Sequence, residues 1–244
     1  KSFRDSPIQA MIDQTHISSD GRVVAIRPGL SLQDEHAPEN AIALQAEMVK
    51  SYSFDITVGI RAQIYPALET VRLEHRIRLE DIIELTRQSP IVPPRRHRLI
   101  AKAIFYGFDG DHEAALHFVI PQMEHLVRWH LNRIGVKTTT LNKQGIETEN
   151  GLSTIAALAE LDSVFGDELA FEIRSLFCDP FGPNLRNEMA HGLLDSSDCS
   201  NEHSVYAWWF LLRLVFSQMV AAQIRQTALS QKALAEGPEP RVPL

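Results

Sequence analysis

The stretch VYAWWFLLRLVFSQMVAAQI, residues 205–224, is apolar around most of the circumference that it would have as a helix. A surface helix carries one apolar stripe, whereas a helix that is apolar nearly all round must be enclosed by other elements. We therefore expect this segment to be the central helix of the core. In such a helix Trp208 and Trp209 are core residues rather than platforms on which nucleic-acid bases stack.

Several amphipathic segments precede this helix and supply partners for it. Apolar residues recur at steps of three and four in residues 99–108, 112–134, 152–161 and 168–178, with Pro121 interrupting the second stripe. Helices joined by short turns pack as antiparallel neighbours. The sequence therefore predicts a mainly α protein whose C-terminal part is an antiparallel helical bundle.

The N-terminal part mixes a small β element with helices. An Asp-Gly pair at Asp20 separates AMIDQTHI from RVVAIR, which predicts one small β-hairpin. We expect a helix from about residue 36 to residue 51, and a second helical stretch over residues 60–87 with a kink at Pro66.

A proline-rich segment, SPIVPPRRH at residues 89–97, cannot be regular helix and is the best candidate for a domain boundary. The predicted organisation is an N-terminal extension over residues 1–94 and a helical bundle over residues 95–228. Residues 229–244, which end in EGPEPRVPL, are predicted to be a flexible tail.

Composition indicates a soluble globular protein: the chain has 244 residues, of which 44% are hydrophobic and 23% charged. The two cysteines, Cys178 and Cys199, form no CxxC pair, which favours a reducing compartment. No run of 18 apolar residues and no signal-peptide pattern is present, so we expect a cytoplasmic protein that does not bind a membrane.

The net charge of −7 argues against a large surface that binds nucleic acid regardless of sequence. A smaller, local site that binds nucleic acid would still be compatible with this charge. One basic cluster, at Arg95, Arg96, His97, Arg98 and Lys102, is either a solvated face or a patch that faces phosphates.

A near-match to a zinc signature does not predict a metal site. His112 and His117 are one residue further apart than the two histidines of HExxH. At about 100° per residue their side chains would lie about 140° apart on a helix, so we interpret them as surface residues. We expect neither a metal nor a cofactor.

The segment PNLRNEMAHGLL, residues 183–194, has an ordinary structural interpretation in part. Pro183 and Asn184 can open a helix, with Asn184 as its cap, and Gly192 can end it. Capping does not explain why Arg186 and His191 lie so close together.

Arg186, Asn187 and His191 carry the chemistry for cutting a phosphodiester without metal. Arginine is a permanently charged, forked donor suited to phosphate, and histidine exchanges a proton near neutral pH. Asn187 and His191 share one helix face, but Arg186 and His191 diverge in an ideal helix. They can act together only if the first turn is irregular or if two protomers share one cleft.

An arginine followed by a polar residue and a histidine, late in a helical bundle, resembles the RxxxxH signature of HEPN (higher eukaryotes and prokaryotes nucleotide-binding) domains. More narrowly, the RNxxxHG pattern from Arg186 to Gly192 is similar to that of a HEPN-like family of unknown function that includes the endoplasmic reticulum membrane-associated RNA degradation protein. The resemblance extends over residues 95–220. It also rests on SPIVPPR at residues 89–95, Gly110-Asp111, IPQME at residues 120–124, and Arg128.

The resemblance implies a homodimeric HEPN fold and a metal-independent endoribonuclease that cleaves single-stranded RNA and leaves a 2′,3′-cyclic phosphate. Arg186 and His191 would be catalytic, and Asn187 would orient them. The implied role is in a toxin, defence or RNA-decay system, with an antitoxin or another protein as a further partner. Glu124 and Arg128 match family positions without an implied role.

The alternative is a non-catalytic module that binds nucleotide or RNA or mediates dimerisation. On a purely structural interpretation, His191 is packed under apolar side chains and Arg186 is paired with an internal carboxylate such as Glu124.

Overall fold

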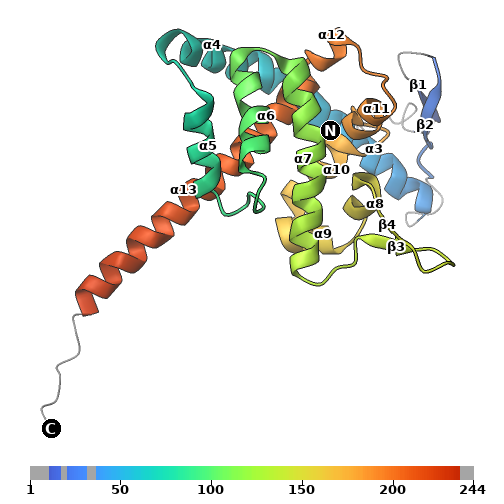
Figure 1. The fold of residues 1–244 in the computed structure, drawn as a ribbon. Coiled ribbons are helices and arrows are strands. Elements are labelled where there is room, and N and C mark those ends of the chain that lie inside the picture. The colour runs from blue at the N-terminus through green and yellow to red at the C-terminus, as the bar shows by residue number, and fades with distance from the viewer. Residues whose placement is uncertain (1–10, 18–20, 32–36, 237–244) are drawn as a thin grey trace, which may run out of the picture.

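The computed structural model describes residues 11–17, 21–31 and 37–236, and the protein is mainly helical (Figure 1). This confirms the predicted fold class. Helix α13, Glu202–Glu236, runs through the centre of the molecule and contacts α3, α5, α6 and α7. Its Trp208 is 1% exposed, and the indole Nε1–H donates to the carbonyl of Ile104 at 2.9 Å. Trp208 is thus a core residue as predicted, whereas Trp209 is half-buried.

The C-terminal half of α13 leaves the core and projects from the body of the molecule (Figure 1). The helix continues to Glu236, so residues 229–236 of the predicted tail are helical, and the flexibility of the tail stays a prediction. Alanines and other good helix formers in TALSQKALAE sustain the helix before the prolines begin. Residues 237–244 lie outside the described part of the chain.

Helices α6, His97–Asp109, and α7, His112–Arg133, form an antiparallel hairpin that turns at Gly110, where φ is +92°. Gly107 lets α6 approach α13 closely, since a Cβ there would lie 2.1 Å from Nε1 of Trp208. Pro121 does not interrupt α7, because it lies on the exposed side, where water can satisfy the carbonyl that loses its partner.

The predicted β-hairpin is present as strands β1, Gln14–Ile17, and β2, Val23–Arg27. The strands are antiparallel, with Gln14 opposite Arg27. Of the connecting turn, residues 18–20 lie outside the described part of the chain.

The N-terminal helices differ from the prediction in their bounds. The chain forms α3, a π-helical turn, α4 and α5 in succession, at Pro38–Gly59, Ile60–Ile64, Tyr65–Glu74 and Leu79–Gln88. The predicted helix end near Ser51 is wrong, because the helix continues through Gly59 in helical geometry. The π-helical turn directly precedes Pro66, whose missing N–H and bulky ring a widened turn can accommodate.

Short elements connect α7 to α13. They are β3, β4, α8, α9, α10, α11 and α12, at Thr139–Leu141, Glu147–Glu149, Leu152–Ala156, Glu160–Phe165, Asp167–Phe177, Leu185–Ala190 and Ser196–Cys199. The segment 135–150 thus contains a second small hairpin, in which Thr139 lies opposite Glu149. Its exposed strands carry Thr and Glu, so no apolar alternation marks them in the sequence.

One hydrophobic cluster joins residues on both sides of the proline-rich segment 89–97. Ile60 and Ile82 belong to the same cluster as Leu116 and Trp208. The division into residues 1–94 and 95–228 stays a prediction.

Within the described residues, one helical stretch, Ser196–Gln231, is long and apolar enough to cross a membrane by length and composition. Its most apolar window is 44% buried inside the protein. The central helix of a protein core has the same composition, so this stretch is weak evidence for a membrane span. The cytoplasmic location stays a prediction.

Candidate functional site

Helix α11, Leu185–Ala190, carries the candidate residues and is anchored by Leu185, which is 1% exposed. The residue before it, Asn184, has φ +49° and ψ +37°, and its side chain makes no capping hydrogen bond. Asn184 thus stands at the N-cap position as predicted, but its side chain does not cap the helix. Asparagine tolerates the left-handed region better than most residues, so Asn184 instead makes the sharp turn into the helix.

Gly192 ends α11 as predicted. Its φ of +66° allows the N–H of Leu193 to donate to the carbonyl of Glu188 at 2.9 Å, and its own N–H donates to Met189 at 3.0 Å. This pair of bonds is a Schellman motif, which glycine favours. The glycine that follows His191 thus has a structural role, and His191 is exposed at the C-cap position directly after the helix.

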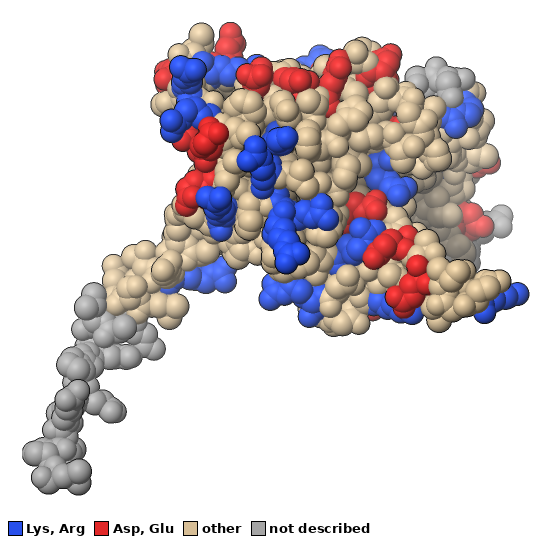
Figure 2. Space-filling view, in the orientation of Figure 1, with Lys and Arg blue, Asp and Glu red and all other residues tan. Residues whose placement is uncertain are grey.

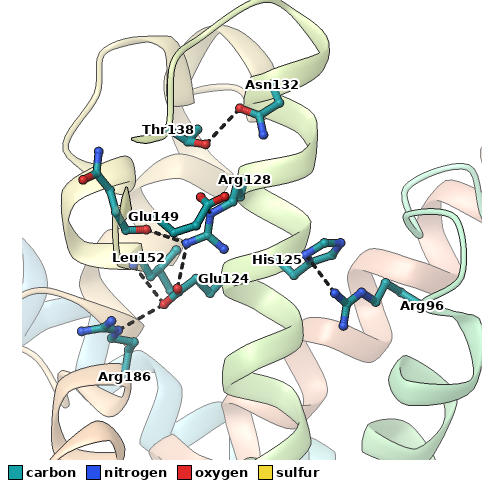
Figure 3. A network of polar contacts seen from close by, with 10 residues as sticks. Arg96, Glu124, His125, Arg128, Asn132, Thr138, Glu149, Leu152 and Arg186 are labelled. Atoms are coloured by element: carbon teal, nitrogen blue, oxygen red, sulfur yellow. Dashed lines mark hydrogen bonds and ion pairs between the residues drawn. The ribbon is translucent and has the colours of Figure 1, made fainter. Parts of the chain in front are cut away.

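Arg186 does not point into open solvent but back to α7 (Figure 3). Its Nε lies 3.2 Å from Oε2 of Glu124, and the same oxygen accepts the backbone N–H of Leu152 at 3.0 Å. The other oxygen of Glu124 accepts from Nη2 of Arg128 at 2.9 Å. One carboxylate therefore ties α7, α8 and α11 together, as the structural interpretation of Arg186 predicts.

Electrostatics keep Glu124 ionised. Burial alone would raise its pKa, but hydrogen bonds from Arg128 and Leu152 and the charge of Arg186 overcome that effect and lower the pKa. The Glu124 side chain is 22% exposed and that of Arg186 27%, so the pair is only partly shielded from water.

Gly151, which precedes α8, makes room for the guanidinium of Arg186. A Cβ at this position would lie 2.4 Å from Nη2 of Arg186. Sequence reasoning missed Gly151, because nothing local distinguishes a glycine that caps a helix from one that admits a distant side chain.

Arg128 is tied down more firmly than Arg186. Besides Glu124, it binds Glu149 through Nε at 2.9 Å and donates from Nη2 to the carbonyl of Asn150. Its side chain is 15% exposed. We conclude that Arg128 holds the second hairpin and the start of α8 against α7.

The structure does not bring Arg186 and His191 onto one ligand within a single chain. Helix α11 is regular between them, so their side chains diverge by about 140°. No hydrogen bond links Arg186 to His191 in the part of the chain that is described. Asn187 is half-buried, and His191 is exposed rather than packed under apolar side chains. The structural interpretation is therefore correct for Arg186, which pairs with Glu124, but not for His191, which is exposed.

An open pocket of about 370 Å³ lies beside α11, but its lining does not include Arg186, Asn187 or His191. Leu185 and Glu188 face this pocket from α11, and His16 and His203 face it from the first hairpin and from α13. Sequence reasoning missed the pocket because its residues come from segments that are far apart in the chain.

The other candidate ligands stay apart. His117 is exposed, whereas His112 is half-buried with its ring 6.2 Å from that of Trp208. Among the described residues, no group of three His, Cys, Asp or Glu side chains could hold a metal ion. Burial raises the pKa of Cys178 to about 11, so this thiol stays protonated near neutral pH.

Comparisons with protein-family models, curated proteins and solved structures found no match to this chain. The likeness to HEPN domains therefore rests on the residues of the motif and on the helical fold. The activity that this likeness implies is a proposal.

Proposed function

We propose that the chain is a metal-independent endoribonuclease that cleaves single-stranded RNA at a site formed by Arg186, Asn187 and His191. The observation that supports this most is the exposure of His191 at the end of α11, in the same short helix as an anchored arginine. An exposed imidazole can reach a substrate, whereas a buried one could serve only packing.

The proposed chemistry divides between the two charged residues. His191 takes the proton of a ribose 2′-hydroxyl, whose oxygen attacks phosphorus and forms a 2′,3′-cyclic phosphate. The bond to the 5′-oxygen breaks, and that oxygen takes a proton from solvent water. Arg186 stabilises the charge on the phosphoryl oxygens through its terminal nitrogens, since Glu124 binds its Nε.

Two copies of the chain would complete this site. Arg186 turns toward α7 and diverges from His191, so one phosphate cannot meet both side chains of one α11 without rearrangement. A homodimer can place His191 of one copy beside Arg186 of the other. The biological setting we propose is a toxin, defence or RNA-decay system, with an antitoxin or another protein as regulator.

A mixing experiment tests this shared site. Arg186→Ala and His191→Ala proteins are each expected to be inactive, but a mixed dimer carries one site with both wild-type residues. Co-refolding equal amounts should restore about a quarter of the wild-type cleavage rate, because half of the dimers are mixed and each has one of its two sites intact. Activity in neither the wild type nor the mixture would contradict the proposal.

A second function is favoured by the ion pair between Arg186 and Glu124. An arginine that braces α11 against α7 fits a module that binds nucleotide or RNA, or that dimerises, without turnover. In that case RNA would raise the melting temperature of the wild type but would not be cut. Arg186→Ala would lose that stabilisation or the dimer, as measured by thermal shift and light scattering.

A further inference from the structure

Charge is unevenly distributed along this acidic chain. From Arg95 to Phe108 the sequence contains no Asp or Glu, and from Ala114 to Ile146 the one acidic residue is Glu124. These stretches cover the hairpin of α6 and α7 and the segment that follows it. The hairpin is therefore locally basic although the whole chain has a net charge of −7.

The basic residues of the hairpin form a surface patch. Figure 2 shows Lys and Arg side chains gathered on the face where α6 and α7 lie in Figure 1. Arg95 and Arg98 are exposed, and Lys102 is half-buried. The ammonium of Lys102 lies 5.6 Å from the ring centre of Phe118, which itself stacks on Tyr106 at 5.7 Å. The patch thus combines positive charge with partly exposed aromatic rings.

The patch is continuous with the surroundings of Arg186. Nη2 of Arg96 lies 3.4 Å from Nδ1 of His125, on one side of α7 (Figure 3). Burial and the charges of Arg96 and Arg128 lower the pKa of His125. On the other side of α7, Glu124 joins Arg128 to Arg186.

We propose that the row formed by Lys102, Arg98, Arg96 and His125, here called the α6–α7 track, binds the sugar-phosphate backbone of single-stranded RNA. The end point of the track at Arg186 rests on the proposed function, but backbone binding along the track does not require cleavage. Basic residues interleaved with aromatic rings suit single strands, whose bases stack on such rings.

The shape of the track favours a linear polyanion over an anionic membrane. Acidic residues bound it at both ends, with Asp109 and Glu113 near the turn between α6 and α7, and Glu147 and Glu149 in β4. A planar lipid surface would meet these carboxylates together with the basic row, whereas a strand lying along the row avoids them.

The test measures binding by fluorescence anisotropy of a labelled oligouridylate of about 12 nucleotides, a length within the range that such grooves span. The background is His191→Ala, so that cleavage does not interfere. Adding Arg98→Glu and Lys102→Glu should weaken binding at least tenfold and reduce the slope of log affinity against log salt by about one to two.

The matched control is Lys50→Glu with Arg225→Glu, which makes the same change in net charge at two exposed positions on α3 and α13. This control should weaken binding much less. If Arg98→Glu and Lys102→Glu harmed folding, as judged by circular dichroism, Arg98→Gln with Lys102→Gln should still weaken binding at least threefold.

If the variant with Arg98→Glu and Lys102→Glu bound RNA as tightly as the control variant, the proposal of the α6–α7 track would be overturned. Binding to phosphatidylserine vesicles with none to RNA would also overturn it. Track-dependent binding by a protein with intact His191 that never cuts RNA would refute the proposed function and leave the track standing, so the two failures are distinguishable.

Discussion

Nε of Arg186 and Oε2 of Glu124 lie 3.2 Å apart, although 62 residues separate them in the sequence. The contact fixes α11 against α7, and it directs the arginine of the candidate site away from the histidine that follows in the same helix. The same pair therefore stabilises this region, and it underlies our proposal that a second copy of the chain completes the site.

Glu124→Gln should destabilise the protein. The substitution removes the charge that Arg128 and Arg186 share, which leaves Arg186 without its carboxylate and Arg128 with Glu149 alone. We expect the free energy of unfolding in urea to fall by about 1–3 kcal/mol. Glu84→Gln is the control, because its pair with Arg87 is exposed and should contribute less than about 0.5 kcal/mol. Equal effects of both changes would contradict the role of Glu124.

Gly151→Ala should displace the side chain of Arg186 while changing the stability of the fold only slightly. The new Cβ meets the flexible end of Arg186, which can move away, and φ of −71° suits alanine. The free energy of unfolding should change by less than about 1 kcal/mol, whereas RNA binding or cleavage that depends on Arg186 should fall several-fold.

Gly107→Ala is the contrasting substitution. Its Cβ would meet the fully buried indole of Trp208, which has no space into which to retreat. We expect a loss of about 3 kcal/mol in the free energy of unfolding, measured in the same urea titration. A Gly107→Ala protein as stable as Gly151→Ala would show that α6 does not approach α13 this closely.

The stability of the protein should depend on pH through three half-buried histidines. Burial lowers the pKa of His112, His130 and His203 below the ordinary value of 6.5. The unfolded chain then binds more protons than the folded one, so this stabilisation is complete above pH 6.5 and is lost as the pH falls through the folded-state pKa values. Urea unfolding should show a decrease between about pH 7 and pH 5.

His130→Gln is the variant that checks this assignment. His130 lies at 3.0 Å from the carbonyl of Ile91, a contact that glutamine can replace without titrating. The decrease in stability toward acid pH should be smaller in this variant than in the wild type. An unchanged pH dependence would mean that other groups cause it.

The sequence was most informative where burial is nearly complete. The segment around Trp208 is apolar all round and forms the central helix as predicted, because no other placement removes that surface from water. Bounds set by tertiary packing were harder to predict. Gly59 looks like a helix end, yet the helix continues through it into the π-helical turn before Pro66.

In the candidate site, too, some features could be predicted from the sequence and others depend on tertiary packing. The pairing of Arg186 with Glu124 could be named in advance as one alternative, because an internal arginine needs a carboxylate. The role of Gly151 could not, since it depends on the path of a side chain from another helix. Nor does the sequence say that Asn184 adopts a left-handed conformation instead of capping α11.

The most direct test of the proposed activity is an RNA cleavage assay in the presence of excess chelator. Wild type and His191→Ala are compared on the same single-stranded RNA, with products analysed for a 2′,3′-cyclic phosphate. Because the exposed His191 caps α11 without a structural partner in the described contacts, its substitution should leave the melting temperature unchanged and reduce cleavage by at least a hundredfold. Cleavage that persists in the folded His191→Ala protein, or a wild type that cuts no RNA, would contradict the proposal.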